Sequence, residues 1–88
     1  MLAASKRFKS MEPFIMRPPF DFADDRMFDH VGEEFIFVLS GSMEVEFPSQ
    51  RVTLKAGDAL YFESHVPHRS RSLGRKHAEA LVIVTPGD

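Results

Sequence analysis

The 88-residue chain has no cysteine, no tryptophan and no long hydrophobic run. Without cysteine it can form neither a disulfide framework nor a zinc–thiolate site. No apolar stretch approaches the ~18–20 residues that a membrane-spanning helix needs. The first ten residues, MLAASKRFKS, lack the apolar core of a signal peptide. We therefore expect a cytoplasmic protein with no membrane partner, whose fold depends on packing alone.

The chain also lacks a strong charge of either sign, because its formal net charge is −2. Such a balance gives no electrostatic reason to expect nucleic-acid binding. Apolar residues make up 43% of the chain, and nine of them are Phe, which is enough for a globular core. A chain of this length forms one domain and buries only about 60–65% of the surface that it exposes when unfolded. A thin core favours support from a partner subunit, so we expect a homodimer.

From Met27 onward the pattern is that of short β-strands. The segment 33–40, EEFIFVLS, is rich in branched and aromatic residues. In the segment 42–47, SMEVEF, apolar and polar residues alternate, which is typical of a strand with one buried face. Further short strands are predicted after the turns, in the segments 52–54, 59–62, 68–72 and 78–84. Seven or eight short strands at this spacing indicate an all-β barrel or sandwich.

The segment before Met27 is less regular. Residues 1–12 contain good helix formers and could form one or two helical turns, or they could be a leader or linker remnant. Three prolines then limit the chain to a short edge strand over Phe14–Arg17 and a loop over Asp21–Arg26. Four phenylalanines in this stretch need burial, and a second copy of the chain could supply it.

A histidine and a carboxylate share the predicted inner face of one strand. If the segment 31–33 stays extended, alternation places five residues on that face: Phe28, His30, Glu34, Ile36 and Val38. The apolar members should point inward, and His30 and Glu34 would then do the same, unless Gly32 forms a bulge. Buried ionisable groups are costly unless they are paired or bound to a cation.

Two further histidines, His65 and His68, lie in the segment HVPH, residues 65–68. Pro67 shapes a turn, and in the following strand His68 and Ser70 share a face, while Arg69 and Arg71 share the other. Arginines should face water, which turns His68 inward. Two imidazoles and one carboxylate would form a site suited to divalent iron, manganese, nickel or zinc. A hydrogen-bonded histidine–carboxylate pair without metal is the alternative.

The faces of the other strands that are predicted to be solvent-exposed carry charged residues. Glu44 and Glu46 alternate with apolar residues and are predicted to be solvated. Arg69 and Arg71 are predicted to be exposed on their strand, and His77 lies in a polar loop where we expect exposure.

These residues resemble the motifs of the cupin superfamily over His30 to Pro86. The first motif, G-x5-H-x-H-x3-E-x6-G, is matched by His30, Glu34 and Gly41, and the second is matched by Gly57 and His68. The resemblance implies a jelly-roll barrel (a double-stranded β-helix) over residues 13–88, with metal ligands at His30, Glu34 and His68.

Departures from the motifs reduce that site to three ligands. Phe28 stands where the family has its first metal-binding histidine, and Ser72 replaces an asparagine of the second motif. Glu63 and His65 replace the proline and glycine of that motif. Water, or His65, would complete the metal shell, or the site would be metal-free.

The stretches 30–47, 56–62, 66–74 and 80–86 further resemble the carboxy-terminal cupin sensor half of bacterial helix-turn-helix regulators. No helix-turn-helix fits before Met27. The resemblance implies a sensing domain that binds a small polar ligand such as a carboxylate and makes no contact with nucleic acid itself. The ligand pocket is predicted at Phe28, Ile36, Val38, Leu60, Phe62, His65 and Ser70. The alternatives are a small metal-dependent enzyme (dioxygenase, isomerase or decarboxylase), which we rank second, and a structural dimerisation module.

Overall fold

Seven strands account for the regular structure in the computed structural model, which describes residues 10–86. Their bounds are β1 Glu12–Met16, β2 Glu33–Ser40, β3 Ser42–Phe47, β4 Gln50–Lys55, β5 Ala59–Glu63, β6 Arg69–Leu73 and β7 Glu79–Val84. This part of the chain contains no helix. The all-β prediction is confirmed, and β2 and β3 have the bounds that the sequence pattern predicted.

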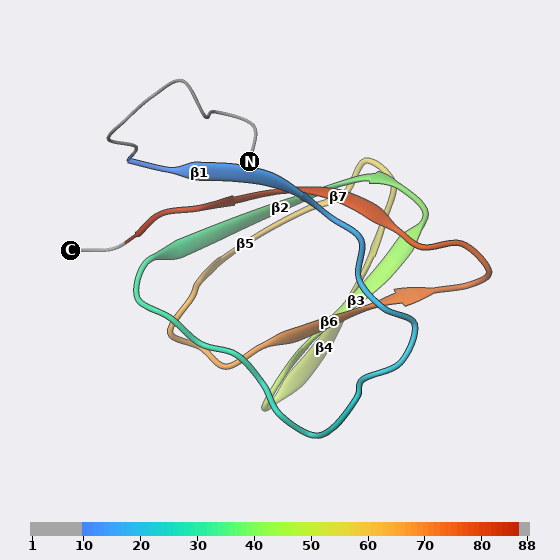
Figure 1. The fold of residues 1–88 in the computed structure, drawn as a ribbon, viewed down its shortest axis with the longest axis horizontal. Coiled ribbons are helices and arrows are strands. Elements are labelled where there is room, and N and C mark those ends of the chain that lie inside the picture. Colours follow the sequence, from blue (N-terminus) through green and yellow to red (C-terminus); the bar gives the residue numbers. More distant parts are fainter. Residues whose placement is uncertain (1–9, 87–88) are drawn as a thin grey trace.

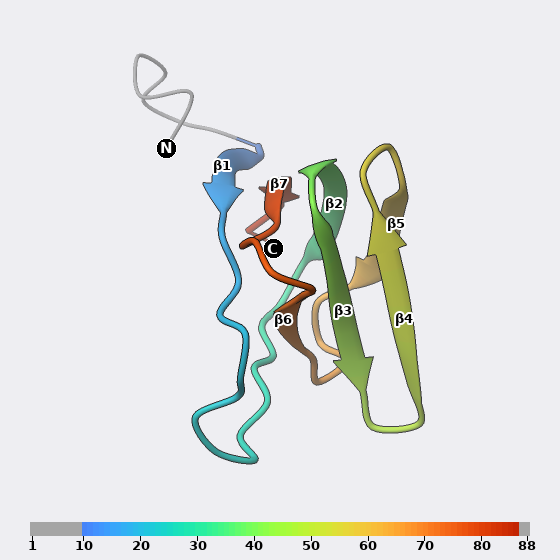
Figure 2. The ribbon, with the colours of Figure 1, turned by 90° about the vertical axis from the view of Figure 1, so that its right-hand side faces the viewer.

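The strands form two antiparallel sheets that pack against each other (Figure 1). The larger sheet has the order β1-β7-β2-β5, seen edge to edge in Figure 2, and the smaller has the order β4-β3-β6. Alternation buries one face of each sheet between them. That core consists of Ile36, Val38, Ala80 and Val82 from the larger sheet, Met43, Val45, Phe47 and Leu54 from the smaller, and Ala78 before β7. The jelly-roll architecture expected of a small cupin is confirmed.

Strand β1 lies at the edge of the larger sheet, where it pairs with β7 alone. An edge position suits a strand that contains Pro13, which has no amide hydrogen to donate. The edge strand was predicted two residues later, at Phe14–Arg17. The predicted helical turn in residues 1–12 falls largely on residues 1–9, which lie outside the described residues; Ser10 and Met11 are not helical, and Glu12 begins β1.

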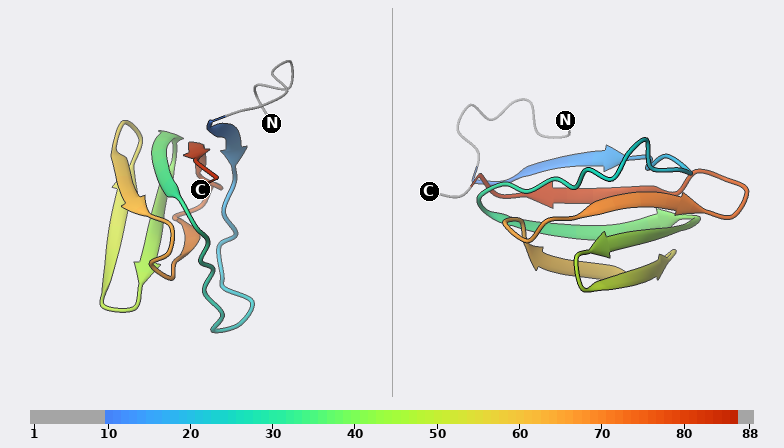
Figure 3. Two further views of the ribbon diagram at one scale, coloured as in Figure 1. Left: turned by 90° about the vertical axis from the view of Figure 1, so that its left-hand side faces the viewer. Right: turned by 90° about the horizontal axis from the view of Figure 1, so that it is seen from below.

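A long irregular segment connects β1 to β2 and extends toward β6 (Figures 1 and 3). We call residues 17–28 the strap. Buried Ser72 fixes its start, because the Ser72 amide donates to the Pro19 carbonyl and the Ser72 hydroxyl donates to the Pro18 carbonyl, both at 2.6 Å. The same hydroxyl accepts from the Ala78 amide at 2.9 Å. His77 is exposed as predicted, yet its Nδ1 also bonds the Pro18 carbonyl at 2.9 Å.

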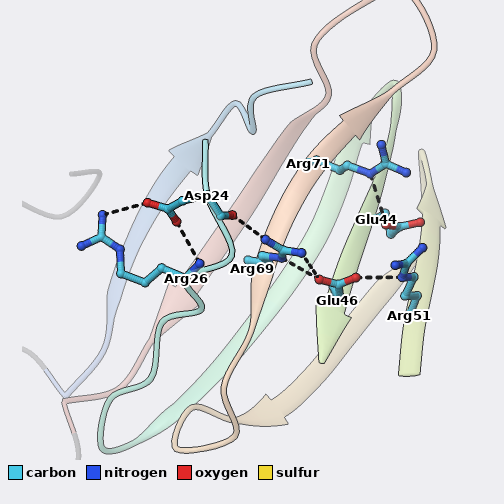
Figure 4. Close-up of polar contacts among 7 residues, drawn as sticks. All are labelled: Asp24, Arg26, Glu44, Glu46, Arg51, Arg69 and Arg71. Atoms are coloured by element: carbon cyan, nitrogen blue, oxygen red, sulfur yellow. Dashed lines mark hydrogen bonds and ion pairs between the residues drawn. The ribbon is translucent and has the colours of Figure 1, made fainter. Parts of the chain in front are cut away.

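Glu44 and Glu46 were predicted to be solvated, but the structure shows both side chains buried on the outer face of the smaller sheet. They are only 8% and 7% exposed. Arg71 Nε lies 3.2 Å from Glu44, and Glu46 accepts from Arg69 at 2.6 Å and from Arg51 at 2.8 Å (Figure 4). Arg69 was predicted to be solvated, yet its side chain is 15% exposed.

The aromatic ring of the strap explains this burial. The centroid of the Phe22 ring lies 3.7 Å from the Arg69 guanidinium carbon. The same guanidinium donates to the Asp24 carbonyl at 2.7 Å (Figure 4). Alternation along a strand identifies the outer face correctly, but it contains no information about a distant segment that folds across it.

The hydrogen bond from Arg69 holds the pKa of Glu46 below its ordinary value; the charges of Arg69 and Arg51 add to this effect, and burial opposes it. Because the pKa is lower in the folded state, this group stabilises the fold above the pKa of an unfolded carboxyl, and its contribution is lost as the pH falls through the folded value.

We therefore expect the acid-induced loss of stability to be shallower in Glu46→Gln than in the wild type. Urea unfolding at a series of acidic pH values would measure it, with Glu12→Gln on the exposed edge strand as the control. Parallel curves for wild type and Glu46→Gln would contradict the assignment.

Candidate metal and ligand site

Glu34 is the first inward-facing residue of β2. It shares its face with Ile36 and Val38, both fully buried, and is itself 8% exposed. His30 lies before the strand, on a turn at Gly32, whose φ is 116°. The turn is held because the His30 amide donates to the Ser64 carbonyl at 3.0 Å and the Ser64 amide donates to the Gly32 carbonyl at 2.9 Å. The alternation argument assumed that the segment 31–33 is extended, but the turn at Gly32 interrupts it. His30 nevertheless lies next to Glu34.

His68 immediately precedes β6, and an isolated antiparallel bridge joins it to Phe28. The Phe28 amide donates to the His68 carbonyl at 2.8 Å, and the His68 amide donates to the Phe28 carbonyl at 2.9 Å. This bridge attaches the end of the strap to the start of β6. It thereby brings His30, two residues beyond Phe28, next to His68.

The three side chains converge on one carboxylate oxygen. Glu34 Oε1 lies 3.3 Å from His30 Nε2 and 3.4 Å from His68 Nε2. One ligand atom from each residue lies within 4.8 Å of the other two. The Glu34 and His68 side chains are 10% and 9% exposed, whereas that of His30 is 41% exposed. Glu34 and His68 are thus buried, and the group is accessible to solvent on the side of His30.

Backbone carbonyls fix the orientation of both imidazoles. Nδ1 of His68 lies 2.8 Å from the Val66 carbonyl, and Nδ1 of His30 lies 3.2 Å from the Val31 carbonyl. A carbonyl can only accept, so each Nδ1 carries the hydrogen. In the neutral rings both Nε2 lone pairs then face the carboxylate. Three acceptors facing one another require a cation between them, either a proton or a metal ion.

The electrostatics of His68 reflect that requirement. Burial is the largest single influence and disfavours the charged form of His68. The hydrogen bonds to Glu34 and to the Val66 carbonyl favour the charged form, as do the charges of Glu34 and Asp29. Together these effects outweigh burial. The pKa of His68 is therefore raised above its ordinary value. The site attracts positive charge.

A cavity of about 280 Å³ adjoins the site, and Glu34 and His68 lie in its wall. Its wall consists of Met16, Arg17, Pro18, Pro19, Phe28, Glu34, His68, Arg69 and Ser70. A second cavity of about 240 Å³ shares Pro19, Phe28, Arg69 and Ser70 with it and extends beneath the strap. Most of the wall is apolar, with a few polar groups, as is usual for small-molecule sites.

The predicted pocket residues are distributed unevenly. Phe28, which is 60% exposed, and Ser70 line the cavity. Ile36 and Val38 instead lie in the core, because their inward direction leads between the two sheets and not to the opening. His65 is exposed and pairs with Glu63 at 3.3 Å, outside the group of three.

Leu60 and Phe62 line a separate cavity of about 220 Å³ with Phe47 and Val66. Phe62 still contacts the site from below, because its ring centroid lies 4.8 Å from that of His68.

Sequence reasoning missed four residues of the cavity wall, namely Met16 at the end of β1 and Arg17, Pro18 and Pro19 at the start of the strap. They meet the site only because a distant serine fixes the strap, and strand periodicity carries no signal for that contact.

Comparison with known proteins agrees with the fold. Residues 18–84 match the cupin domain family, and the chain belongs to that family. Its fold is also similar to that of protein NMB1881 from Neisseria meningitidis, with a TM-score of 0.73 at 18% identity over 91% of this chain and 78% of the other.

Two curated relatives represent different functional classes. (S)-2-hydroxypropylphosphonic acid epoxidase from Streptomyces wedmorensis is 33% identical over 73 residues, covering 76% of this chain and 37% of the epoxidase. An Fe(II) form of that epoxidase, called HppE, has been solved with its substrate and has a TM-score of 0.68 at 29% identity, covering 86% of this chain and 45% of the other. The uncharacterized HTH-type transcriptional regulator YobQ from Bacillus subtilis (strain 168) is 37% identical over 57 residues, covering 65% of this chain and 23% of the regulator.

This chain therefore spans less than half the length of the curated relatives that it matches. Within residues 10–86, no helix is long and apolar enough to cross a membrane.

Proposed function

We propose that the chain is a small-molecule-binding cupin domain that holds a divalent transition metal through His30, Glu34 and His68. The observation that carries this proposal is the orientation of the imidazoles. Both Nδ1 atoms face backbone carbonyls, so both Nε2 lone pairs face the Glu34 carboxylate. Hydrogen bonds of this kind to the second ring nitrogen accompany most metal-binding histidines.

The donor set fits such an ion. Two neutral imidazoles and one carboxylate suit iron, manganese, nickel or zinc and leave coordination positions open. Phe28, in place of a fourth ligand, borders the cavity with an apolar ring. A bound ion would supply a Lewis acid that orients and polarises a ligand oxygen.

The residues around the site suggest the class of ligand. Apolar side chains from the strap form one wall of the cavity, and Arg17 and Arg69 lie at its border. A small carboxylate or other small polar compound would place its oxygens toward the metal and its carbon skeleton against Phe28. We propose sensing of such a compound, in the cytoplasm and by a homodimer, as the role of this domain. The similarity to the regulator supports it, and any nucleic-acid contact would belong to another part of such a regulator.

A second candidate function is catalysis at the same site. It is favoured by the 33% identity to an epoxidase, an Fe(II) form of which has been solved with its substrate. Turnover of a small hydroxylated or phosphonate compound by the iron-loaded protein would promote this alternative over sensing.

Metal titration of protein made without a chelating tag tests the proposal. We expect one transition-metal ion per chain, with the affinity reduced more than about tenfold in His30→Ala and in His68→Ala. His65→Ala is the matched control, because His65 also pairs with a glutamate at 3.3 Å but is exposed and lies outside the group of three. Equal affinity in all three variants, or no binding to the wild type, would refute the metal site.

A further inference from the structure

The cavity beside the proposed metal site is elongated, and the strand register of the larger sheet gives its length. Glu34 lies in the cavity wall near the start of β2. Met16, in the same wall, pairs with Ala80, which pairs in turn with Val38 of β2. Met16 is therefore level with a residue four positions beyond Glu34, or about 13 Å along the strands at ~3.3 Å per residue. We call the end at Glu34 the metal end and the end at Met16 the far end.

The opposite wall, formed by β6 and the strap, has the same length. His68 lies at the metal end, where it bridges to Phe28. Four residues later, the amide and the hydroxyl of Ser72 donate to the carbonyls of Pro19 and Pro18. Both prolines line the cavity, and Pro18 is fully buried. The cavity is thus bounded by the metal-binding residues at one end and by the start of the strap at the other.

The far end of the cavity is apolar, because its side chains are those of Met16, Pro18 and Pro19. Between the two ends, Ser70 contributes the only hydroxyl group of the wall. Burial of an apolar chain is favourable in such surroundings, whereas a charged group would lose its hydration without gaining a partner.

Two arginines also border the cavity, and both already have a carboxylate partner. Arg17 lies 2.7 Å from Glu79. Arg69 lies 2.6 Å from Glu46 and also donates to the Asp24 carbonyl at 2.7 Å. Neither guanidinium requires an acid group from the ligand, so the cavity favours a compound whose single acid group lies at the metal end.

The dimensions of the cavity limit the apolar part of that compound. A length of about 13 Å, less the carboxylate and its contact with the metal ion, leaves room for about six to eight carbons at ~1.3 Å each. The volume of about 280 Å³ agrees. It holds about nine groups of the ~30 Å³ that one water molecule occupies.

We infer that the ligand is an amphipathic monocarboxylate whose straight apolar chain, of about six to eight carbons, lies between β6 and the start of the strap and reaches Met16. Its carboxylate lies at the metal end. The inference rests on the proposed function, because the carboxylate binds the ion that His30, Glu34 and His68 hold. Met16 is the residue that limits the chain length.

Calorimetric titration of the full 88-residue chain, loaded with manganese, tests this inference with straight-chain carboxylates from acetate to decanoate. The affinity of the wild type should rise about twofold to fourfold per methylene and stop rising at about eight carbons. Octanoate should bind at least about tenfold more tightly than octanedioate, because the second carboxylate would lose its hydration at the apolar far end. Equal or tighter binding of octanedioate would overturn the inference.

Substitutions of Met16 test where the chain ends. Met16→Phe fills the far end and should move the plateau to shorter acids, whereas Met16→Ala should move it to longer ones. The two shifts have opposite signs, so either variant that folds is sufficient. Met11→Ala is the matched control, because Met11 is 51% exposed and lies outside the cavity. An unchanged plateau in the Met16 variants would contradict the placement of the chain.

Manganese affinity is measured first in every variant and should equal that of the wild type, because none of the three metal-binding residues is changed. A wild type that binds no manganese would refute the proposed function and this inference with it. Manganese-loaded protein whose carboxylate affinity is independent of chain length would refute this inference alone.

Discussion

Replacing Glu34 by Gln should weaken transition-metal binding by more than about a hundredfold and, at alkaline pH where His68 is neutral, should leave the metal-free domain at least as stable as the wild type. Loss of an outer-shell partner alone typically costs 10–100-fold in metal affinity, and Glu34 is proposed as a direct ligand. The substitution also removes the only negative charge of the three-residue group, whose oxygen lies 3.3 and 3.4 Å from the two Nε2 atoms.

The opposite effect on the metal-free protein follows from the same geometry. The Glu34 carboxylate is 8% exposed and faces two lone pairs, an arrangement that needs a cation. A glutamine amide has nearly the same shape but can donate a hydrogen to an imidazole nitrogen. The substitution therefore separates binding from stability, as is common at functional sites.

Thermal unfolding with and without metal measures both effects, because a ligand that binds only the native state raises the Tm. Metal should raise the Tm of the wild type and leave that of Glu34→Gln unchanged. Glu63→Gln is the matched control, since Glu63 also pairs with a histidine at 3.3 Å, but both partners are exposed. Metal-induced stabilisation that survives in Glu34→Gln would exclude this carboxylate as a ligand.

The second large effect is expected in the core. Ile36→Ala should lower the free energy of unfolding by about 2–5 kcal/mol, the cost of leaving a cavity where an isoleucine was packed. Ile36 is fully buried at the centre of β2, which pairs with β7 on one side and β5 on the other. Small domains have only about 5–15 kcal/mol in total, so this single change removes much of the stability.

Urea unfolding would measure the loss, with Thr53→Ala as an exposed control that should change stability by no more than about 0.5 kcal/mol. A loss for Ile36→Ala no larger than that of the control would show that β2 does not occupy the centre of the core.

The parts of this fold that sequence predicts are those that depend on local alternation. The period of two in β3 gave its bounds and its buried face, and the same period placed Glu34 on the face of Ile36 and Val38. Alternation predicts that a side chain points inward, but not whether it lies in the core between the sheets or in the wall of the pocket. Ile36 and Val38 were therefore assigned to the pocket wall, although they lie in the core.

Features that depend on the strap could not be predicted in this way. The burial of Glu46 requires the Arg69 guanidinium and the Phe22 ring above it, and Phe22 lies 24 positions before Glu46 in the sequence. The approach of His30 to His68 likewise depends on the bridge between Phe28 and His68. Alternation predicted only that both histidines point inward, and the resemblance to cupin motifs added the expectation that they meet.

The central claim, that His30, Glu34 and His68 surround a metal ion, is tested most directly by anomalous scattering from crystals grown with manganese, iron or zinc. The account predicts one anomalous peak within about 2.0–2.2 Å of both Nε2 atoms and of a Glu34 oxygen. A peak at other residues, or no peak between these three side chains at saturating metal, would contradict it.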